Sequence, residues 1–207
     1  MMIVADRVEE ASAEVGGANG AVPLALVRYR AADDVGLLLA RCAFALCEAG
    51  HHIQGIVQIS RQRPDRRKCD MFLQNLATGE QVCISEDRGD GARGCRLDRA
   101  ALAQATLWAE QAFALRPQLL VLNKFGKEEA LGRGFFPVMA EALDANVPVL
   151  IAVSDLNFDA AQALTAGAGT PIEPVESAIV DWCAAVVRSR SGEPAHGYAM
   201  SPYTINP

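Results

Sequence analysis

The chain has no excess of basic residues and no long hydrophobic run. Its 207 residues include 19 Lys and Arg against 25 Asp and Glu, for a formal net charge of −6. General nucleic-acid binding depends on cations that neutralise phosphates, so this balance argues against a nucleic-acid partner. No stretch approaches the roughly 20 apolar residues that span a bilayer, and the N-terminus lacks the regions of a signal peptide. We therefore expect a cytoplasmic protein without membrane insertion.

Paired cysteines are also missing. The six cysteines are dispersed rather than grouped as Cys-x-x-Cys, and they are Cys42, Cys47, Cys69, Cys83, Cys95 and Cys183. Zinc sites in small domains use such pairs, so we expect reduced structural thiols instead. Cys95 has the better case for reactivity because Arg93 and Arg96 are close in sequence, but no base accompanies it.

The residues of a phosphate-binding loop are absent where the pattern would place one. Segment 29–36 reads Tyr-Arg-Ala-Ala-Asp-Asp-Val-Gly and lies between a strand-like run and a helical run. A P-loop needs glycines for close backbone approach, a lysine for the phosphates and a Ser or Thr hydroxyl for Mg²⁺, and none stands in register. We interpret Asp33 and Asp34 as caps of the following helix, because carboxylates stabilise its free amides and dipole.

What is present is an alternation of strand and helix patterns. We expect strands near 22–28, 53–59, 118–122 and 148–153, and helices near 34–49, 98–115, 131–145, 156–166 and 175–189. Strands separated by helical crossovers predict a mostly parallel α/β sheet covered on both faces. One β-hairpin interrupts the alternation, with runs 69–76 and 80–85 on either side of Thr78-Gly79.

Composition predicts a single core. The 51% of hydrophobic residues suffices for one sizeable domain, which we place at 21–190. Segment 1–20 ends in a Gly-rich stretch and is predicted to be a flexible extension, while 191–207 mixes Pro and Gly without a period and is predicted to be a tail.

Candidate ligand residues follow the predicted parallel strands, at the edge where open α/β sheets bind ligands. Asn123, Lys124, Gly126 and Lys127 come after a buried run, and their amide, ammonium and backbone groups suit an oxyanion. Gln58 and Ser154 end two further strands. Loop 61–68 adds five cations that could close over an anion, namely Arg61, Arg63, Arg66, Arg67 and Lys68. Each of these groups can also be explained without a ligand, as part of a solvated loop, a strand end or a helix cap.

Two histidines lie at the other edge of the predicted sheet. His51 and His52 follow Gly50 in the turn after the first predicted helix. We interpret them as surface turn residues. As metal ligands they would need further donors from another chain or from His196 in the tail.

The order of elements resembles that of small P-loop nucleoside triphosphatases related to nucleotide kinases. In those proteins the second phosphate-site strand ends in Asp-Glu-x-Gly-x-x-Glu, and here the matching segment is 123–129, Asn-Lys-Phe-Gly-Lys-Glu-Glu. Gly126 and Glu129 match, whereas Asn123 and Lys124 replace the two acids and Val35 replaces the P-loop lysine. The resemblance implies a three-layer P-loop-like fold with an inserted β-hairpin. The departures disfavour a Mg-nucleotide cofactor, since they remove metal ligands and a phosphate-binding cation together.

The chain also resembles a bacterial family of unknown function often encoded near molybdate-uptake genes. The residues that carry this resemblance are Leu122 to Glu129, the run Gly-Arg-Gly-Phe at 132–135 and the run Gly-Cys-Arg-Leu-Asp at 94–98. It brings no established activity, but it implies a connection with molybdate or another oxyanion.

The sequence therefore predicts a non-hydrolytic, degenerate P-loop-fold protein that binds a small anion in a regulatory or carrier role. The anion is an oxyanion such as molybdate or the phosphate of a nucleotide. Two alternatives stay open. One is a nucleoside triphosphatase or phosphotransferase with an unconventional phosphate loop, and the other is a protein-interaction module whose remnant pocket is empty, with another protein or a second copy as partner.

Overall fold

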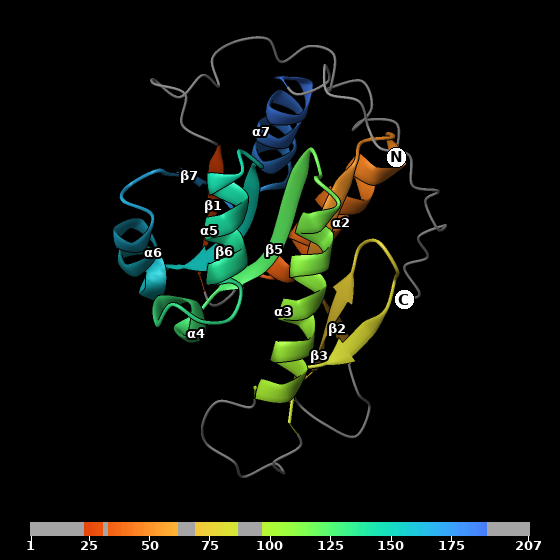
Figure 1. Ribbon diagram of the computed structural model, residues 1–207, viewed down its shortest axis with the longest axis vertical. Coiled ribbons are helices and arrows are strands. Elements are labelled where there is room, and N and C mark those ends of the chain that lie inside the picture. The colour runs from red at the N-terminus through yellow and green to blue at the C-terminus, as the bar shows by residue number, and fades with distance from the viewer. Residues whose placement is uncertain (1–22, 31–32, 62–68, 87–96, 190–207) are drawn as a thin grey trace.

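A mostly parallel β-sheet forms the middle of the molecule (Figure 1). The computed structural model describes residues 23–30, 33–61, 69–86 and 97–189. Within these residues seven strands follow the order β4-β3-β2-β5-β6-β1-β7. Their bounds are β1 Leu24–Tyr29, β2 Ile53–Arg61, β3 Asp70–Asn75, β4 Gln81–Cys83, β5 Leu119–Phe125, β6 Val149–Ser154 and β7 Gly169–Ile172. Strands β1, β2, β5, β6 and β7 are parallel, whereas β3 and β4 form the antiparallel hairpin.

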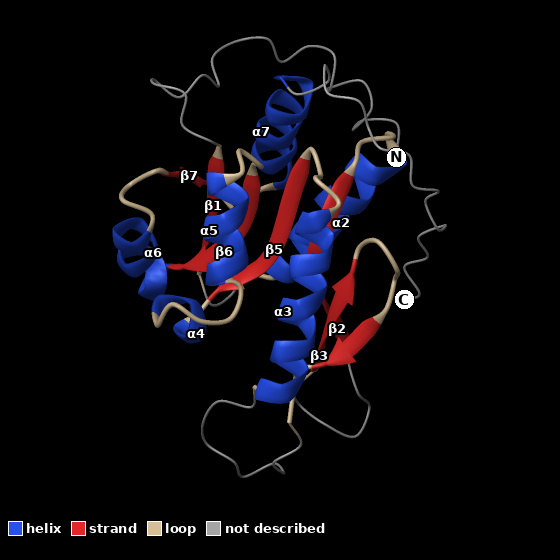
Figure 2. Cartoon of the chain, viewed as in Figure 1, coloured by secondary structure: helices blue, strands red, loops and turns tan. Residues whose placement is uncertain are grey.

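Helices cover both faces of this sheet (Figure 2). Their bounds are α2 Val35–Glu48, α3 Arg99–Ala114, α4 Lys127–Ala130, α5 Phe136–Asp144, α6 Phe158–Leu164 and α7 Glu176–Ser189, with a short 3₁₀ turn at Asp155–Asn157. One buried cluster packs α2 and α7 against one face, and a second packs α3 and α5 against the other. The expected three-layer α/β fold with an inserted β-hairpin is confirmed.

The central strands are apolar on both sides because helices cover both sides. In β5, Leu119 and Val121 belong to the cluster under α2 and α7, whereas Leu120 and Leu122 belong to the cluster under α3 and α5. Such a strand has no polar face, which explains its continuous hydrophobic run. The two layers therefore fix β5 firmly before it reaches the carboxyl edge of the sheet.

The structure corrects three predicted elements. The strand predicted at 118–122 continues to Phe125, so Asn123 and Lys124 lie in β5 rather than in a loop. The single helix predicted at 131–145 is wrong, because α4 ends at Ala130 and α5 begins at Phe136. Gly132 and Gly134 lie between them with positive φ, a conformation that interrupts a helix. Strand β7 was not predicted.

Two further points concern the ends of the chain and its helices. The extension and tail predicted at 1–20 and 191–207 lie outside the described residues, so these domain limits stay predictions. Among the described residues, none of the helices combines the length and apolar character that crossing a bilayer requires.

Candidate functional site

A β-bulge at Asn123 shapes the carboxyl end of β5. Leu122 pairs with Ile151 of β6, but the next pair joins Lys124 and Ala152, so Asn123 is an extra residue on β5. An extra residue interrupts the alternation of side chains along a strand. Phe125 consequently packs in the layer under α3 and α5. Lys124 instead lies close to Tyr29, at the end of β1, with its Nζ 5.6 Å from the ring centroid.

Lys124 is a partly buried cation. Burial lowers the pKa of Lys124, and the nearby carboxylate of Asp34 opposes that shift by favouring the charged form. None of the ion pairs within 4 Å that the described residues form includes Lys124. An ammonium that loses hydration without gaining an ion pair costs folding free energy. A site that retains such a group needs an explanation beyond stability.

Two buried amide side chains come from β5 and from its neighbour β2. Asn123 is 6% exposed, and its Oδ1 has no hydrogen-bond partner among the residues that the structure describes. Gln58 is buried within β2, which continues to Arg61 rather than ending at Gln58 as predicted, and its Nε2 donates to Ser60 Oγ over 3.2 Å. A Cβ placed on Gly36 would lie 3.1 Å from Gln58 Cβ, so the first turn of α2 lies directly against β2. We call Tyr29, Asp34, Gln58, Asn123 and Lys124 the crevice cluster.

Carboxylates occupy the start of α2. The Leu37 amide donates to Asp34 Oδ1 over 3.2 Å, which confirms Asp34 as the helix cap. The Arg30 amide donates to Asp33 Oδ2 over 2.7 Å, so Asp33 stabilises the preceding turn rather than the helix itself. In the nucleoside triphosphatases that the sequence resembles, the lysine belongs to the helix start and the acids to the strand end. Here the acid is on α2 and the lysine is on β5, so the two signs are exchanged.

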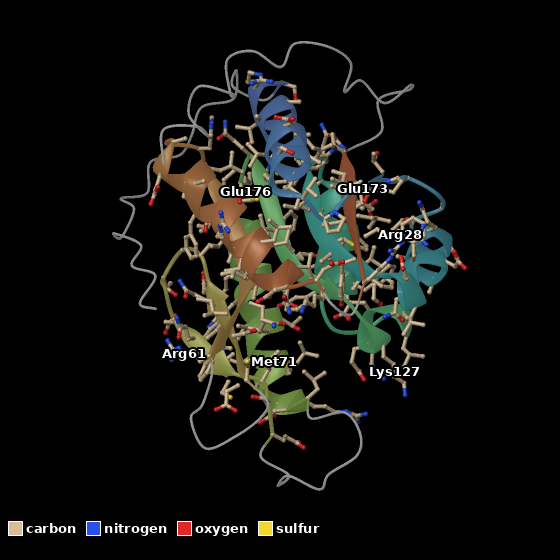
Figure 3. The ribbon with its side chains drawn as sticks, turned by 180° about the vertical axis from the view of Figure 1, so that it is seen from behind. Arg28, Arg61, Met71, Lys127, Glu173 and Glu176 are labelled. Carbon is tan, nitrogen blue, oxygen red and sulfur yellow. The ribbon has the colours of Figure 1, made fainter. Side chains whose placement is uncertain are left out.

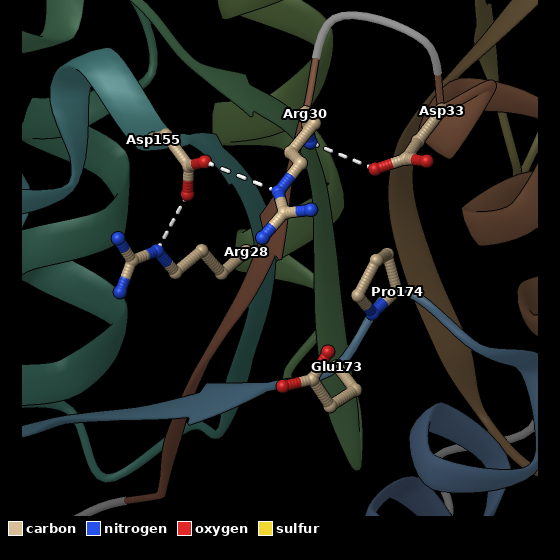
Figure 4. Close-up of a pocket in the computed structure, with 6 residues that line it drawn as sticks. All are labelled: Arg28, Arg30, Asp33, Asp155, Glu173 and Pro174. Carbon is tan, nitrogen blue, oxygen red and sulfur yellow. Dashed lines mark hydrogen bonds and ion pairs between the residues drawn. The ribbon is translucent and has the colours of Figure 1, made fainter.

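A pocket lies at the same edge, where β1, β6 and β7 end (Figure 4). It has a volume of about 430 Å³ and is lined by Arg28, Arg30, Asp33, Asp155, Glu173 and Pro174. Arg28 Nε lies 2.6 Å from Asp155 Oδ1, and Arg30 Nε lies 3.7 Å from Asp155 Oδ2. With two cations and three carboxylates, this pocket suits a small oxyanion less well than the crevice cluster does. The sequence predicts Ser154, the residue before Asp155, at this edge but not the arginines, although Arg28 and Arg30 flank Tyr29 at the end of the first strand pattern.

The other predicted loop residues have different surroundings. Lys127 is exposed at the start of α4, and its side chain extends away from the sheet (Figure 3). The Gly126 amide already donates to Glu129 Oε2 over 2.9 Å. Ser154 Oγ accepts from Asn157 Nδ2 over 3.1 Å. Of the segment 123–127, therefore, Asn123 and Lys124 are the residues that join the crevice cluster.

Arg61 belongs to the hairpin rather than to the crevice cluster. Its Nη2 donates to Gln81 Oε1 over 2.7 Å, and its guanidinium lies 4.6 Å from the centroid of the Phe72 ring. Figure 3 shows Arg61 on the hairpin side of the sheet, away from Arg28 and Glu173. The remaining cations of the predicted lid lie outside the described residues, and they are Arg63, Arg66, Arg67 and Lys68.

The predicted metal candidates lie at the opposite edge. His51 and His52 precede β2 at the amino ends of the parallel strands. Burial lowers the pKa of both imidazoles, and Arg188 lowers that of His51 further. In the part of the chain that the structure describes, no three His, Cys, Asp or Glu side chains are grouped to hold a metal ion.

Glu129 clamps the segment that follows β5. This carboxylate is 4% exposed, and it accepts from the Gly126 amide at 2.9 Å and from the Phe135 amide at 3.0 Å. Gly134 has φ +57°, and a Cβ there would overlap Glu129 Oε1. The clamp thus holds the end of β5, the short helix α4 and the start of α5 in one arrangement.

These features define an α/β fold like that of P-loop nucleoside triphosphatases. The solution structure of a human cancer-related nucleoside triphosphatase is similar, with a TM-score of 0.53, 12% identity, and coverage of 83% of this chain and 99% of that one. The crystal structure of THEP1 from Aquifex aeolicus has a TM-score of 0.45 at 14% identity, covering 74% of this chain and 90% of that one.

The chain belongs to the family described as protein of unknown function (DUF2478), whose model matches residues 24–182. It is also 40% identical over 161 residues to molybdenum import ATP-binding protein ModC 2 of Bradyrhizobium diazoefficiens. That match covers 77% of this chain but spans only 18% of the relative's length.

Proposed function

We propose that this chain is a non-hydrolytic module of P-loop architecture that binds a small oxyanion at the crevice cluster. The observation that carries the proposal is Lys124, a partly buried ammonium without an ion pair among the described residues. A bound oxyanion would supply the missing countercharge. Lys124 has three N–H donors and Asn123 has two, so together they can serve several oxygens of one tetrahedral anion.

The chemistry of the same cluster supports binding without hydrolysis. Phosphoryl transfer in this fold uses Mg²⁺ between the phosphates, held by a hydroxyl and a carboxylate. On β5, Asn123 and Lys124 stand where the resembled family has acids, and the Asp34 carboxylate on α2 is engaged as a cap. Mg²⁺ prefers hard oxygen ligands and is repelled by an ammonium, whereas an anion is attracted by it. The exchange of signs between α2 and β5 therefore favours an anion over a metal nucleotide.

Molybdate is the first ligand to test. The 40% identity to a protein named for molybdenum import supports a connection of this family with that anion. Because the match spans 18% of the relative, we propose a regulatory or carrier role for one module rather than the activity of an entire importer subunit. A nucleotide phosphate is the second ligand class that the same donors fit.

Titration calorimetry tests the proposal. Molybdate, tungstate, sulfate, phosphate and ATP with and without Mg²⁺ are titrated into the protein and into Lys124→Met and Lys127→Met variants. We expect saturable binding that weakens at least about tenfold in Lys124→Met, because a charge-assisted contact is lost. Lys127→Met removes the same charge from the exposed start of α4 and should bind normally. No binding of any of these anions, or equal loss in both variants, would contradict the proposal.

The pH dependence gives a second test of the same site. Only the protonated ammonium attracts an anion, and burial lowers the pKa of Lys124. Affinity should therefore fall as pH rises through this lowered pKa, before ordinary lysines lose their protons. A flat affinity over the alkaline range would argue against Lys124 as the anion contact. Mg²⁺-dependent ATP turnover that Lys124→Met abolishes would instead favour the nucleoside triphosphatase alternative.

A further inference from the structure

The side of α3 that faces away from the sheet forms a groove. Its volume is about 460 Å³, and its second wall comes from Glu128, Arg133 and Gly134. Six residues of α3 line it, namely Arg99, Leu102, Ala103, Thr106, Leu107 and Glu110. Figure 1 shows α3 in front of the sheet, on the opposite side from α2. The groove is thus separate from the crevice cluster, and the inference below does not rest on the proposed function.

The centre of this helix face is apolar although it lies on the surface. Leu107 is 47% exposed, and Ala103 is exposed as well. Thr106 Oγ1 donates to the Leu102 carbonyl over 3.0 Å, so its hydroxyl is satisfied within the helix and its methyl group remains for contact. An apolar helix face bordered by charges is typical of a protein contact.

The residues along this face are arranged symmetrically about its midpoint: apolar and small residues correspond to each other, and the charges at the two ends are opposite in sign. About a midpoint between Gln104 and Ala105, Leu102 corresponds to Leu107 and Ala103 corresponds to Thr106. At the ends of the face, cationic Arg99 corresponds to anionic Glu110. A surface that contacts its own copy across a two-fold axis must be self-complementary in this way.

We propose that this face binds the same face of a second copy of the chain, with the two α3 helices antiparallel. Leu102 of each copy would then pack against Leu107 of the other, while the small side chains of Ala103 and Thr106 allow the helices to approach closely. Arg99 would face Glu110 at both ends of the contact. Parallel helices would place like charges opposite each other, so the charges select the antiparallel arrangement.

The Arg99 side chain is available for this contact. It is 83% exposed, and its one ion pair with a described carboxylate, that of Glu128, is long at 3.9 Å. Glu128 forms a closer ion pair with Arg133, whose Nε lies 2.8 Å from Glu128 Oε2. Arg99 can therefore turn to a partner's carboxylate without leaving Glu128 unpaired.

Sedimentation equilibrium of the whole chain tests the proposal. We expect a reversible dimer, weakened at least about tenfold by Arg99→Glu and by Glu110→Arg, because each places like charges together at both ends. The double variant Arg99→Glu/Glu110→Arg exchanges the charges and should restore the dimer. An equimolar mixture of the two single variants should also form mixed dimers, since every pair is then opposite in sign.

A matched pair of leucine variants provides a readout that does not depend on charge. Leu107→Glu should abolish dimer formation, whereas Leu164→Glu changes a similarly exposed leucine on α6, 42% against 47%, and should leave it intact. Circular dichroism and thermal melting confirm that each variant is folded. A monomer at all concentrations up to about 0.5 mM would overturn the proposal, as would a folded double variant that fails to dimerise. A dimer that survives Leu107→Glu would overturn it too.

Discussion

Replacing Glu129 by Gln tests the clamp at the end of β5. The two carboxylate oxygens accept from the Gly126 and Phe135 amides, and the side chain is buried. Glutamine has almost the same shape but only one acceptor oxygen. Its amino group would face one of the two backbone N–H groups, so a buried donor would meet a donor. Glu129→Gln should therefore destabilise the fold while barely changing the packing volume.

The magnitude follows from the loss of one hydrogen bond to a charged acceptor. Such a bond contributes roughly 1.5–3 kcal/mol, and leaving a buried N–H unpaired adds to that loss, so we expect about 3 kcal/mol. With a urea m-value of about 2 kcal/mol per M, the unfolding midpoint should fall by about 1.5 M. Binding of the proposed oxyanion should weaken as well, because the clamp holds Gly126, two residues after Lys124.

Urea unfolding followed by circular dichroism measures this change. Glu141→Gln is the matched control, because the same substitution is then made on the exposed side of α5. Its effect should stay within about 0.5 kcal/mol, as for most surface changes. If Glu129→Gln were equally mild, the reasoning from buried acceptors would be refuted.

Three further predictions concern single side chains. Lys124→Met should raise the melting temperature of the anion-free protein by about 2 °C, because it removes a desolvated charge, and a lower melting temperature would contradict this. Gly134→Ala should destabilise clearly more than Gly132→Ala, since both have positive φ but only at Gly134 would the new Cβ overlap Glu129; equal denaturation midpoints would argue against that contact. Burial, reinforced by Glu176, raises the pKa of Cys42 to about 12, so native alkylation at pH 8 should modify half-buried Cys83 well before Cys42, as peptide mass spectrometry can show.

Most of the sheet could be predicted from the sequence because its central strands are buried on both sides. The continuous apolar runs of β5 and β6, and the Thr78-Gly79 turn of the hairpin, are local signals that tertiary packing reinforces. Strand β7 has no such signal, because it has four residues, includes Pro171 and exposes two of them. Its place in the sheet depends on pairing with β1, which no local pattern encodes.

The candidate site was predictable in its location but not in its geometry. Lys124 and Asn123 were singled out because they follow a hydrophobic run, and the carboxyl edge collects such residues. In the sequence Lys127 is as good a candidate for contact with an anion as Lys124, yet its side chain is exposed at the start of α4. The two lysines differ because β5 continues through Lys124 and ends before Lys127. The bulge, which is visible only through the register with β6, then sets the side of the sheet on which Lys124 lies. The pocket formed by Arg28 and Arg30 also required the order of the strands.

The bulge makes the pairing register of β5, rather than residue identity, the feature that decides which layer receives a charge. A strand of the same length that paired regularly with β6 would turn Lys124 toward the apolar layer under α3 and α5 and bring Phe125 out of it. Replacing Asn123 by another residue would leave both in place. A gap at Asn123, when homologous chains are aligned, would likewise leave Lys124 opposite Ala152, so the lysine keeps its layer through either change.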